Sequence, residues 1–157
     1  MIDFGRTIDT RMFPPGQRFV GDWAPDARDC LELREGKPWT YQTDYFGLAG
    51  IIYCMLYGKY IEASSVTQAP ETDGPPRYKL ATPFKRYWQG DLWTRLFDML
   101  LNSALVHPDG KLPLCDEVGT IREEMEVWLQ ANCNRADRKS TRLNSSHSGE
   151  SRMPSSA

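Results

Sequence analysis

The sequence predicts a mainly α-helical fold, and three observations support this prediction. Apolar residues recur at the three- and four-residue spacing of a helix in three segments, 45–59, 92–101 and 118–129. No segment shows the sustained apolar–polar alternation of a half-buried strand. The chain has 157 residues, of which 40% are hydrophobic, so it is long enough to bury one core.

Residues 6–43 are expected to form an extended, irregular segment, because prolines and glycines interrupt them throughout. No Ser, Thr or Tyr occurs in 11–39, so the segment is expected to be ordered independently of phosphorylation within it. Asp22, Asp26 and Asp29 place fixed negative charge there instead. We therefore expect a segment that is held by its own packing and carboxylates.

The most apolar part of the chain follows. Asp44 is expected to cap a helix that runs from Tyr45 to about Lys59. Apolar side chains cover nearly every side of this helix, which is typical of a helix that is buried all round. Gly58 is expected to end it, since glycine readily adopts the left-handed conformation that follows many helices.

Two further helices are expected after a polar loop at 62–87, which contains four prolines. Asp91 is the expected N-cap of the first helix, because an amphipathic run of apolar residues follows it. Asp116 precedes the last helix, whose apolar stripe includes Ile121 and Trp128 and whose other face is charged.

Composition excludes several classes of function. The net charge of −2 and the lack of an extended basic surface argue against direct binding of nucleic acid. The longest apolar stretch, 45–57, is shorter than the about 20 residues that a membrane span needs, so no membrane association is expected. The four cysteines lack CxxC spacing, which indicates reduced thiols of an intracellular protein rather than a zinc site or a disulfide framework.

The segment 137–157 differs from the rest in being rich in serine and poor in apolar residues. Its two ends, 137–147 and 151–157, match the translation of the two ends of a short-read sequencing adapter, with room for a barcode between them. We interpret this tail as adapter translation, expect it to be disordered, and exclude it from the fold.

The N-terminus carries a short motif, the triplet Asp3-Phe4-Gly5. Protein kinases use an Asp-Phe-Gly triplet whose carboxylate holds Mg²⁺ on the phosphates of ATP. In kinases an irregular segment, a glutamate and then an Asp at the start of an apolar helix follow the triplet. Glu32, within Leu-Glu-Leu, and Asp44 occur here in that order.

Longer stretches make the resemblance specific. The chain reads IDFGRTID over 2–9, KPWTYQTDYFG over 37–47 and YCMLYG over 53–58. These stretches resemble the Bub family of mitotic checkpoint serine/threonine kinases, with residue choices like those of fungal members. The resemblance covers roughly residues 1–133; the later helices are only compatible with it.

The resemblance implies the C-terminal (large) lobe of a protein-kinase-like fold, as a fragment that lacks the N-lobe and the catalytic loop. Residues 1–43 would be the activation segment, and residues 44–133 the helical remainder of the lobe. No catalytic residue is then expected in the chain.

The resemblance also implies roles for the triplet. Asp3 would bind Mg²⁺ and orient the γ-phosphate of ATP, with a solvated loop aspartate as the alternative. Phe4 would pack under the ATP site, and Gly5 would give the activation segment backbone freedom.

Two further acidic residues receive structural roles. Glu32 would anchor the activation segment through a buried pair with a basic residue, for which Lys111 and Arg122 are the alternatives. The family motif at this point is Ala-Pro-Glu, whereas this chain has Leu31-Glu32-Leu33, so a substrate-binding loop of different shape is expected beside it. Asp44 would hold the backbone of the catalytic loop, cap its own helix, or do both.

The implied function is transfer of the γ-phosphoryl group of MgATP to protein Ser/Thr hydroxyls in the spindle assembly checkpoint. The parent would act in the nucleus and at kinetochores, on protein substrates in chromatin or at kinetochores, and would bind checkpoint proteins through regions outside this chain. The fragment itself is expected to be inactive. One alternative is a non-catalytic checkpoint scaffold; another is an unrelated helical module with a chance triplet, whose 45–58 helix would lie on the surface.

Overall fold

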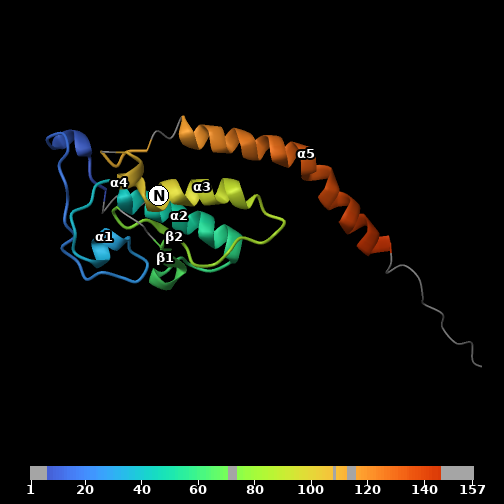
Figure 1. Cartoon of the computed structure of the whole chain (residues 1–157), viewed down its shortest axis with the longest axis horizontal. Helices are drawn as coiled ribbons and strands as arrows, with labels where there is room; N and C mark the ends of the chain where they lie inside the picture. The colour runs from blue at the N-terminus through green and yellow to red at the C-terminus, as the bar shows by residue number, and fades with distance from the viewer. Residues whose placement is uncertain (1–6, 71–73, 108, 113–115, 146–157) are drawn as a thin grey trace, which may run out of the picture.

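The computed structural model describes residues 7–70, 74–107, 109–112 and 116–145, with side chains through Cys133. Helices dominate this part of the chain, as the sequence predicts (Figure 1). The elements are η1 (Thr10–Met12), α1 (Leu31–Arg34), α2 (Gln42–Tyr57), η2 (Ala63–Ser65), β1 (Val66–Gln68), β2 (Tyr78–Leu80), α3 (Gly90–Leu101), α4 (Ser103–Val106) and α5 (Glu117–Ser145).

The core lies between α2 and α3, which pack side by side at the centre of the molecule (Figure 1). From α2, Ala49 and Tyr53 are fully buried, and from α3, Phe97 and Leu100 are nearly so. The first half of α5 packs on α3, where Arg95 and Glu124 form an ion pair at 2.9 Å, and its second half extends away from the body (Figure 1).

The helix starts differ from those expected. Tyr41 is the N-cap of α2, so Asp44 lies within the first turn instead of capping it. The amide oxygen of Gln42 accepts hydrogen bonds from the backbone N–H and the hydroxyl of Thr40, at 2.6 and 3.0 Å, which fixes the chain at the start of the helix. Asp91 likewise lies in the first turn of α3 rather than at its cap. An acid in the first turn still favours the helix through its dipole.

The end of α2 is as expected, and its burial is incomplete. Gly58 ends the helix with a positive φ of 69°. However, one side of α2 is open, because Leu48, Ile51 and Met55 are 39%, 62% and 81% exposed. Within this chain α2 is therefore not buried on every side; the expectation of full burial applies to a longer kinase domain, in which further helices would pack on α2. Apolar composition shows that a face favours burial, but not which segment covers it.

A hairpin within 62–87 was not predicted. Strands β1 and β2 pair antiparallel, with Val66 opposite Leu80 and Gln68 opposite Tyr78. Each strand has only three residues, too few for a period-two pattern to be recognised. The hairpin packs on α3, so this stretch is more ordered than the expected loop.

The first segment is largely irregular, as expected. Phe19 and Trp39 form an isolated antiparallel bridge, in which each N–H donates to the other's carbonyl at 2.9 Å. The Arg28 guanidinium donates to the carboxylate of Asp26 and lowers the pKa of that group to about 2. The Asp29 carboxylate accepts the N–H of Asp26 at 2.8 Å. Aromatic packing and local carboxylates thus hold the segment.

The last helix is longer than expected. It begins at Glu117, directly after Asp116, but continues to Ser145. Residues 137–145 of the proposed adapter segment are thus helical rather than disordered, and 146–157 lie outside the described residues. Polar residues can continue a helix from its packed part without packing themselves. The adapter origin of the segment stays a prediction.

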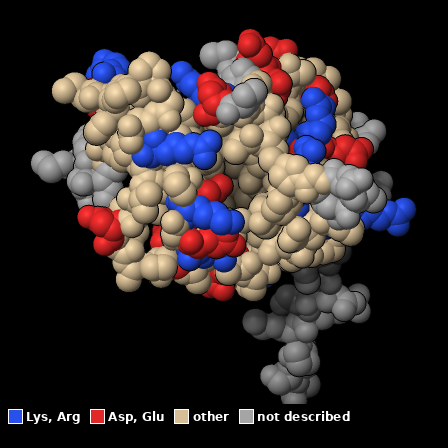
Figure 2. All heavy atoms as spheres, turned by 60° about the vertical axis from the view of Figure 1, so that its left-hand side comes forward, with Lys and Arg blue, Asp and Glu red and all other residues tan. Residues whose placement is uncertain are grey.

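The surface carries charges of both signs. Figure 2 shows Lys and Arg interspersed with Asp and Glu over the face that it presents. Within the described ranges, no helix combines the length and apolar character needed to span a membrane.

Candidate functional site

The kinase-like triplet lies outside the described residues, as do all of Asp3, Phe4 and Gly5. Their roles toward Mg²⁺ and ATP therefore stay predictions. Among the residues that the structure describes, no three His, Cys, Asp or Glu side chains gather closely enough to hold a metal ion.

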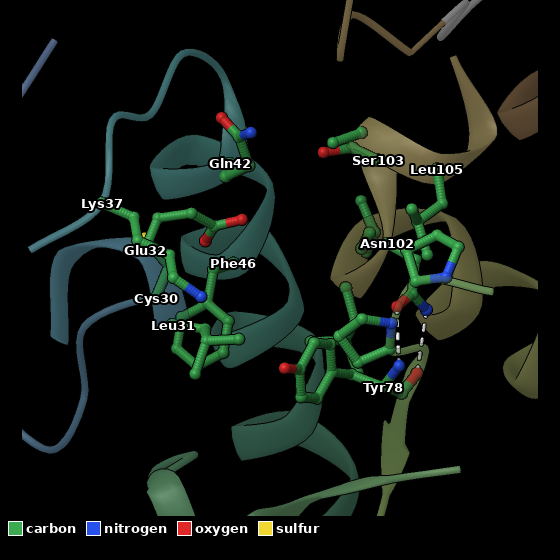
Figure 3. Close-up of a pocket in the computed structure, with 15 residues that line it drawn as sticks. Cys30, Leu31, Glu32, Lys37, Gln42, Phe46, Tyr78, Asn102, Ser103 and Leu105 are labelled. Atoms are coloured by element: carbon green, nitrogen blue, oxygen red, sulfur yellow. Dashed lines mark hydrogen bonds between the residues drawn. The ribbon is translucent and has the colours of Figure 1, made fainter. Parts of the chain in front are cut away.

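Glu32, by contrast, lines a pocket of about 200 Å³. The pocket lies between α1, the start of α2 and the junction of α3 with α4 (Figure 3). Leu31, Phe46, Tyr78 and Leu105 contribute apolar or aromatic walls.

The expected basic partners of Glu32 do not pair with it. The guanidinium of Arg122 lies 3.7 Å from the carboxylate of the next residue, Glu123. No ion pair of Lys111 occurs in the described part of the chain. Lys37 lines the same pocket, but its ammonium pairs with Glu35 at 2.5 Å. The half-buried carboxylate of Glu32 thus has no ion pair within the described ranges.

Cys30 lies beside Glu32 and is 3% exposed. Burial is the main cause that raises the pKa of its thiol to about 11, and the negative charge of Glu32 adds to the effect. At neutral pH the thiol is protonated, so Cys30 is a poor nucleophile. Cys30, Cys54 and Cys133 form no disulfide in the described part of the chain, and Cys115 lies outside it, so the reduced state of the thiols stays a prediction.

The pocket also contains two buried polar residues that sequence reasoning missed. Asn102 is 4% exposed; its side chain accepts the N–H of Tyr78 at 2.7 Å and donates to the carbonyl of Tyr78 at 2.8 Å (Figure 3). Ser103 is 2% exposed, and its hydroxyl oxygen has no hydrogen-bond partner. A polar pair directly after the apolar run of α3 was the signal that could have found them.

Asp44 does not belong to this pocket. Gln42 and Phe46 line it, whereas the exposed side chain of Asp44 lies on another side of the first turn of α2. No hydrogen bond or ion pair of its carboxylate occurs within the described ranges. Glu32 and Asp44 are therefore not brought together, and the carboxylate of Asp44 is available to a contact from elsewhere.

Comparison with known proteins places the chain among checkpoint kinases, although no family model matches it. It is 51% identical over 129 residues to the spindle assembly checkpoint serine/threonine-protein kinase bub1 of Schizosaccharomyces pombe. It is 43% identical over 129 residues to BUB1 of Saccharomyces cerevisiae, and 34% identical over 130 residues to the mitotic checkpoint kinase BUB1 of Mus musculus. The matches cover 82–83% of this chain, but only 11–12% of these relatives.

The fold agrees with this likeness. The crystal structure of the BubR1 kinase domain superposes with a TM-score of 0.64 at 27% identity, over 92% of this chain and 40% of that one. The expected fold class, a mainly helical fragment like the C-terminal lobe of a protein kinase, is thus confirmed.

Proposed function

Because this chain belongs to the Bub family of mitotic checkpoint kinases, we propose that it is part of a protein that transfers the γ-phosphoryl group of ATP to protein Ser/Thr hydroxyls. The observation that carries the proposal is the 51% identity over 129 residues to a spindle assembly checkpoint serine/threonine kinase. Residues 1–43 would be the activation segment, and 44–133 the helical remainder of the lobe.

Asp3 is the residue proposed to meet the cofactor. Mg²⁺ bound there would neutralise charge on the ATP phosphates during transfer. Phe4 would pack beneath the nucleotide, and Gly5 would let the segment change conformation. Glu32 and Asp44 would position the activation segment and the catalytic loop without touching the reacting atoms.

The proposed setting follows the names of the relatives, which are checkpoint kinases. The longer protein would act in the nucleus and at kinetochores on protein substrates in chromatin or at kinetochores. Other checkpoint proteins would bind it through regions outside this chain. The mixed surface charge supports contacts with proteins rather than directly with nucleic acid (Figure 2).

This chain alone is proposed to be inactive. Its sequence contains neither a His-Arg-Asp catalytic motif nor a glycine-rich phosphate loop, both of which protein kinases need for transfer.

The test is a phosphate-transfer assay with labelled ATP and histones, on the longer protein that contains this chain. Asp3→Asn is expected to lower the rate by about 10²-fold or more, a loss typical of removing one electrostatic contact to the reacting groups. Asp9→Asn is the matched control, because Asp9 is an exposed carboxylate that pairs locally with Arg11. The 157-residue chain should show no transfer.

Equal rates for the Asp3 and Asp9 variants would reject the role of Asp3. A folded but inactive longer protein would favour the alternative, a non-catalytic checkpoint scaffold. Transfer by the 157-residue chain alone would contradict its proposed inactivity.

A further inference from the structure

The pocket beside α1 contains a buried hydroxyl without a hydrogen-bond partner and a carboxylate that accepts a hydrogen bond from the Cys30 thiol but has no cation beside it in the described part of the chain. Ser103 is 2% exposed, and its hydroxyl oxygen is buried without a hydrogen-bond partner. The carboxylate of Glu32 has no ion pair within the described ranges. Figure 3 shows the two side chains directed toward one another from opposite sides of the pocket. A buried polar group without a partner is costly, so this arrangement favours a ligand that supplies donors to both sides.

The size and walls of the pocket narrow the class of ligand. A volume of about 200 Å³ is below the range of about 300–1,000 Å³ that is usual for sites of cofactors and drug-sized molecules. It suits one long side chain. Leu31, Phe46 and Leu105 provide apolar surface along which a methylene stem can lie.

We propose that this pocket binds an arginine side chain presented by a partner protein. The guanidinium donates to the carboxylate of Glu32 on one side and to the hydroxyl oxygen of Ser103 on the other. Arginine suits this geometry better than lysine, because its planar group carries five donors that point in different directions. The proposal does not depend on phosphoryl transfer, since binding requires neither ATP nor a catalytic residue.

Lys37 allows the proposal to be tested by a variant that should bind arginine more tightly. It lines the pocket, but its ammonium pairs with Glu35. Its positive charge opposes the entry of a second cation and competes for Glu32. Replacing Lys37 with a neutral side chain of similar length should therefore strengthen binding.

Saturation-transfer NMR on the longer protein tests the proposal, with acetyl-arginine-N-methylamide as the probe and the citrulline analogue as its neutral isostere. The arginine probe is expected to bind about tenfold more tightly than the citrulline probe, the ratio expected when a charge-assisted hydrogen bond is lost. Glu32→Gln should remove this preference, and Ser103→Ala should weaken arginine binding several-fold. Lys37→Met should strengthen it.

Glu123→Gln is the matched control, because it makes the same change of charge at an exposed position on α5 and should leave binding unchanged. Melting temperatures of the variants show that each one folds. The proposal would be overturned if the arginine probe does not bind or if the two probes bind equally. It would also be overturned if the folded Glu32→Gln variant still prefers the arginine probe over the citrulline probe. None of these results depends on whether the protein transfers phosphate.

Discussion

Asn102 ties the hairpin to the helical core through hydrogen bonds to the backbone of β2. Its side-chain amide hydrogen-bonds to the backbone N–H and carbonyl of Tyr78, and its NH₂ group also donates to the carbonyl of Asp98 at 2.9 Å. The side chain of Asp98 in turn pairs with Arg77 next to β2. Asn102, which is 4% exposed, thus pairs the backbone N–H and carbonyl of Tyr78 on the side of β2 that faces α3.

Asn102→Ala is expected to lower the free energy of unfolding by about 1–3 kcal/mol, because it leaves a backbone N–H and a carbonyl of Tyr78 buried without partners. Urea unfolding of the longer protein, followed by tryptophan fluorescence, measures this change. Asn132→Ala is the control, since the side chain of Asn132 donates to the carbonyl of Trp128 within its own helix, and it should change stability by less than about 0.5 kcal/mol. Equal losses in the two variants would contradict the role assigned to Asn102.

Among the elements, the first segment owes its shape to packing. The rings of Phe13 and Phe19 meet edge to face at 5.1 Å between centroids, and those of Phe19 and Trp39 lie 5.6 Å apart. Trp39 is 9% exposed and closes the bridge to Phe19. Since 11–39 contains no hydroxyl residue, we expect this aromatic contact, rather than phosphorylation within 11–39, to hold the segment.

Limited trypsin digestion of the longer protein tests this account of the first segment. Phosphatase treatment should leave the rates of cleavage after Arg18 and Arg28 unchanged, whereas Trp39→Ala should raise them several-fold, because local opening exposes the segment. Val20→Ala is the control, since the side chain of Val20 is 61% exposed. Faster cleavage after phosphatase treatment would show that phosphorylation orders the segment after all.

The helices could be predicted because their signals are local. Periodic apolar residues placed α2, α3 and the start of α5, and Gly58 marked the end of α2. The strands could not be predicted, because three-residue strands are stabilised by Asn102 and α3, which are distant in sequence. Asp44 and Asp91 resembled caps, but each helix begins before them.

The pocket shows the same division between local and distant signals. Resemblance alone pointed to Glu32, and the structure places it in a pocket. The sequence could not decide whether Lys111 or Arg122 pairs with Glu32. Such pairing depends on how helices that are distant in sequence pack together. Ser103 carries no sequence signal for a ligand; its hydroxyl stands out only through burial without a partner.

At the scale of the whole molecule, the open face of α2 is the main departure from a closed core. Gly47, Leu48, Ile51 and Met55 form one exposed stripe, and a groove of about 410 Å³ lies along part of it. An apolar surface of this kind on a soluble protein usually marks a contact. This chain corresponds to 40% of the BubR1 kinase domain that it resembles, so the proposed longer protein would contain further chain that can cover the stripe.

Met55→Lys tests this interpretation, because its effect should reverse between the two proteins. The 157-residue chain should be poorly soluble and lack a sharp cooperative melt, and a charge on the open stripe should raise its soluble fraction after centrifugation. In the longer protein the same change should lower the free energy of unfolding by at least about 2 kcal/mol, since a covered methionine is lost and a charge is buried.

Ala49→Lys is the control. Ala49 is fully buried on the opposite side of α2, so this change should destabilise both proteins. If Met55→Lys leaves the stability of the longer protein unchanged, the stripe stays open there, and the covering of α2 by the rest of the kinase domain is rejected.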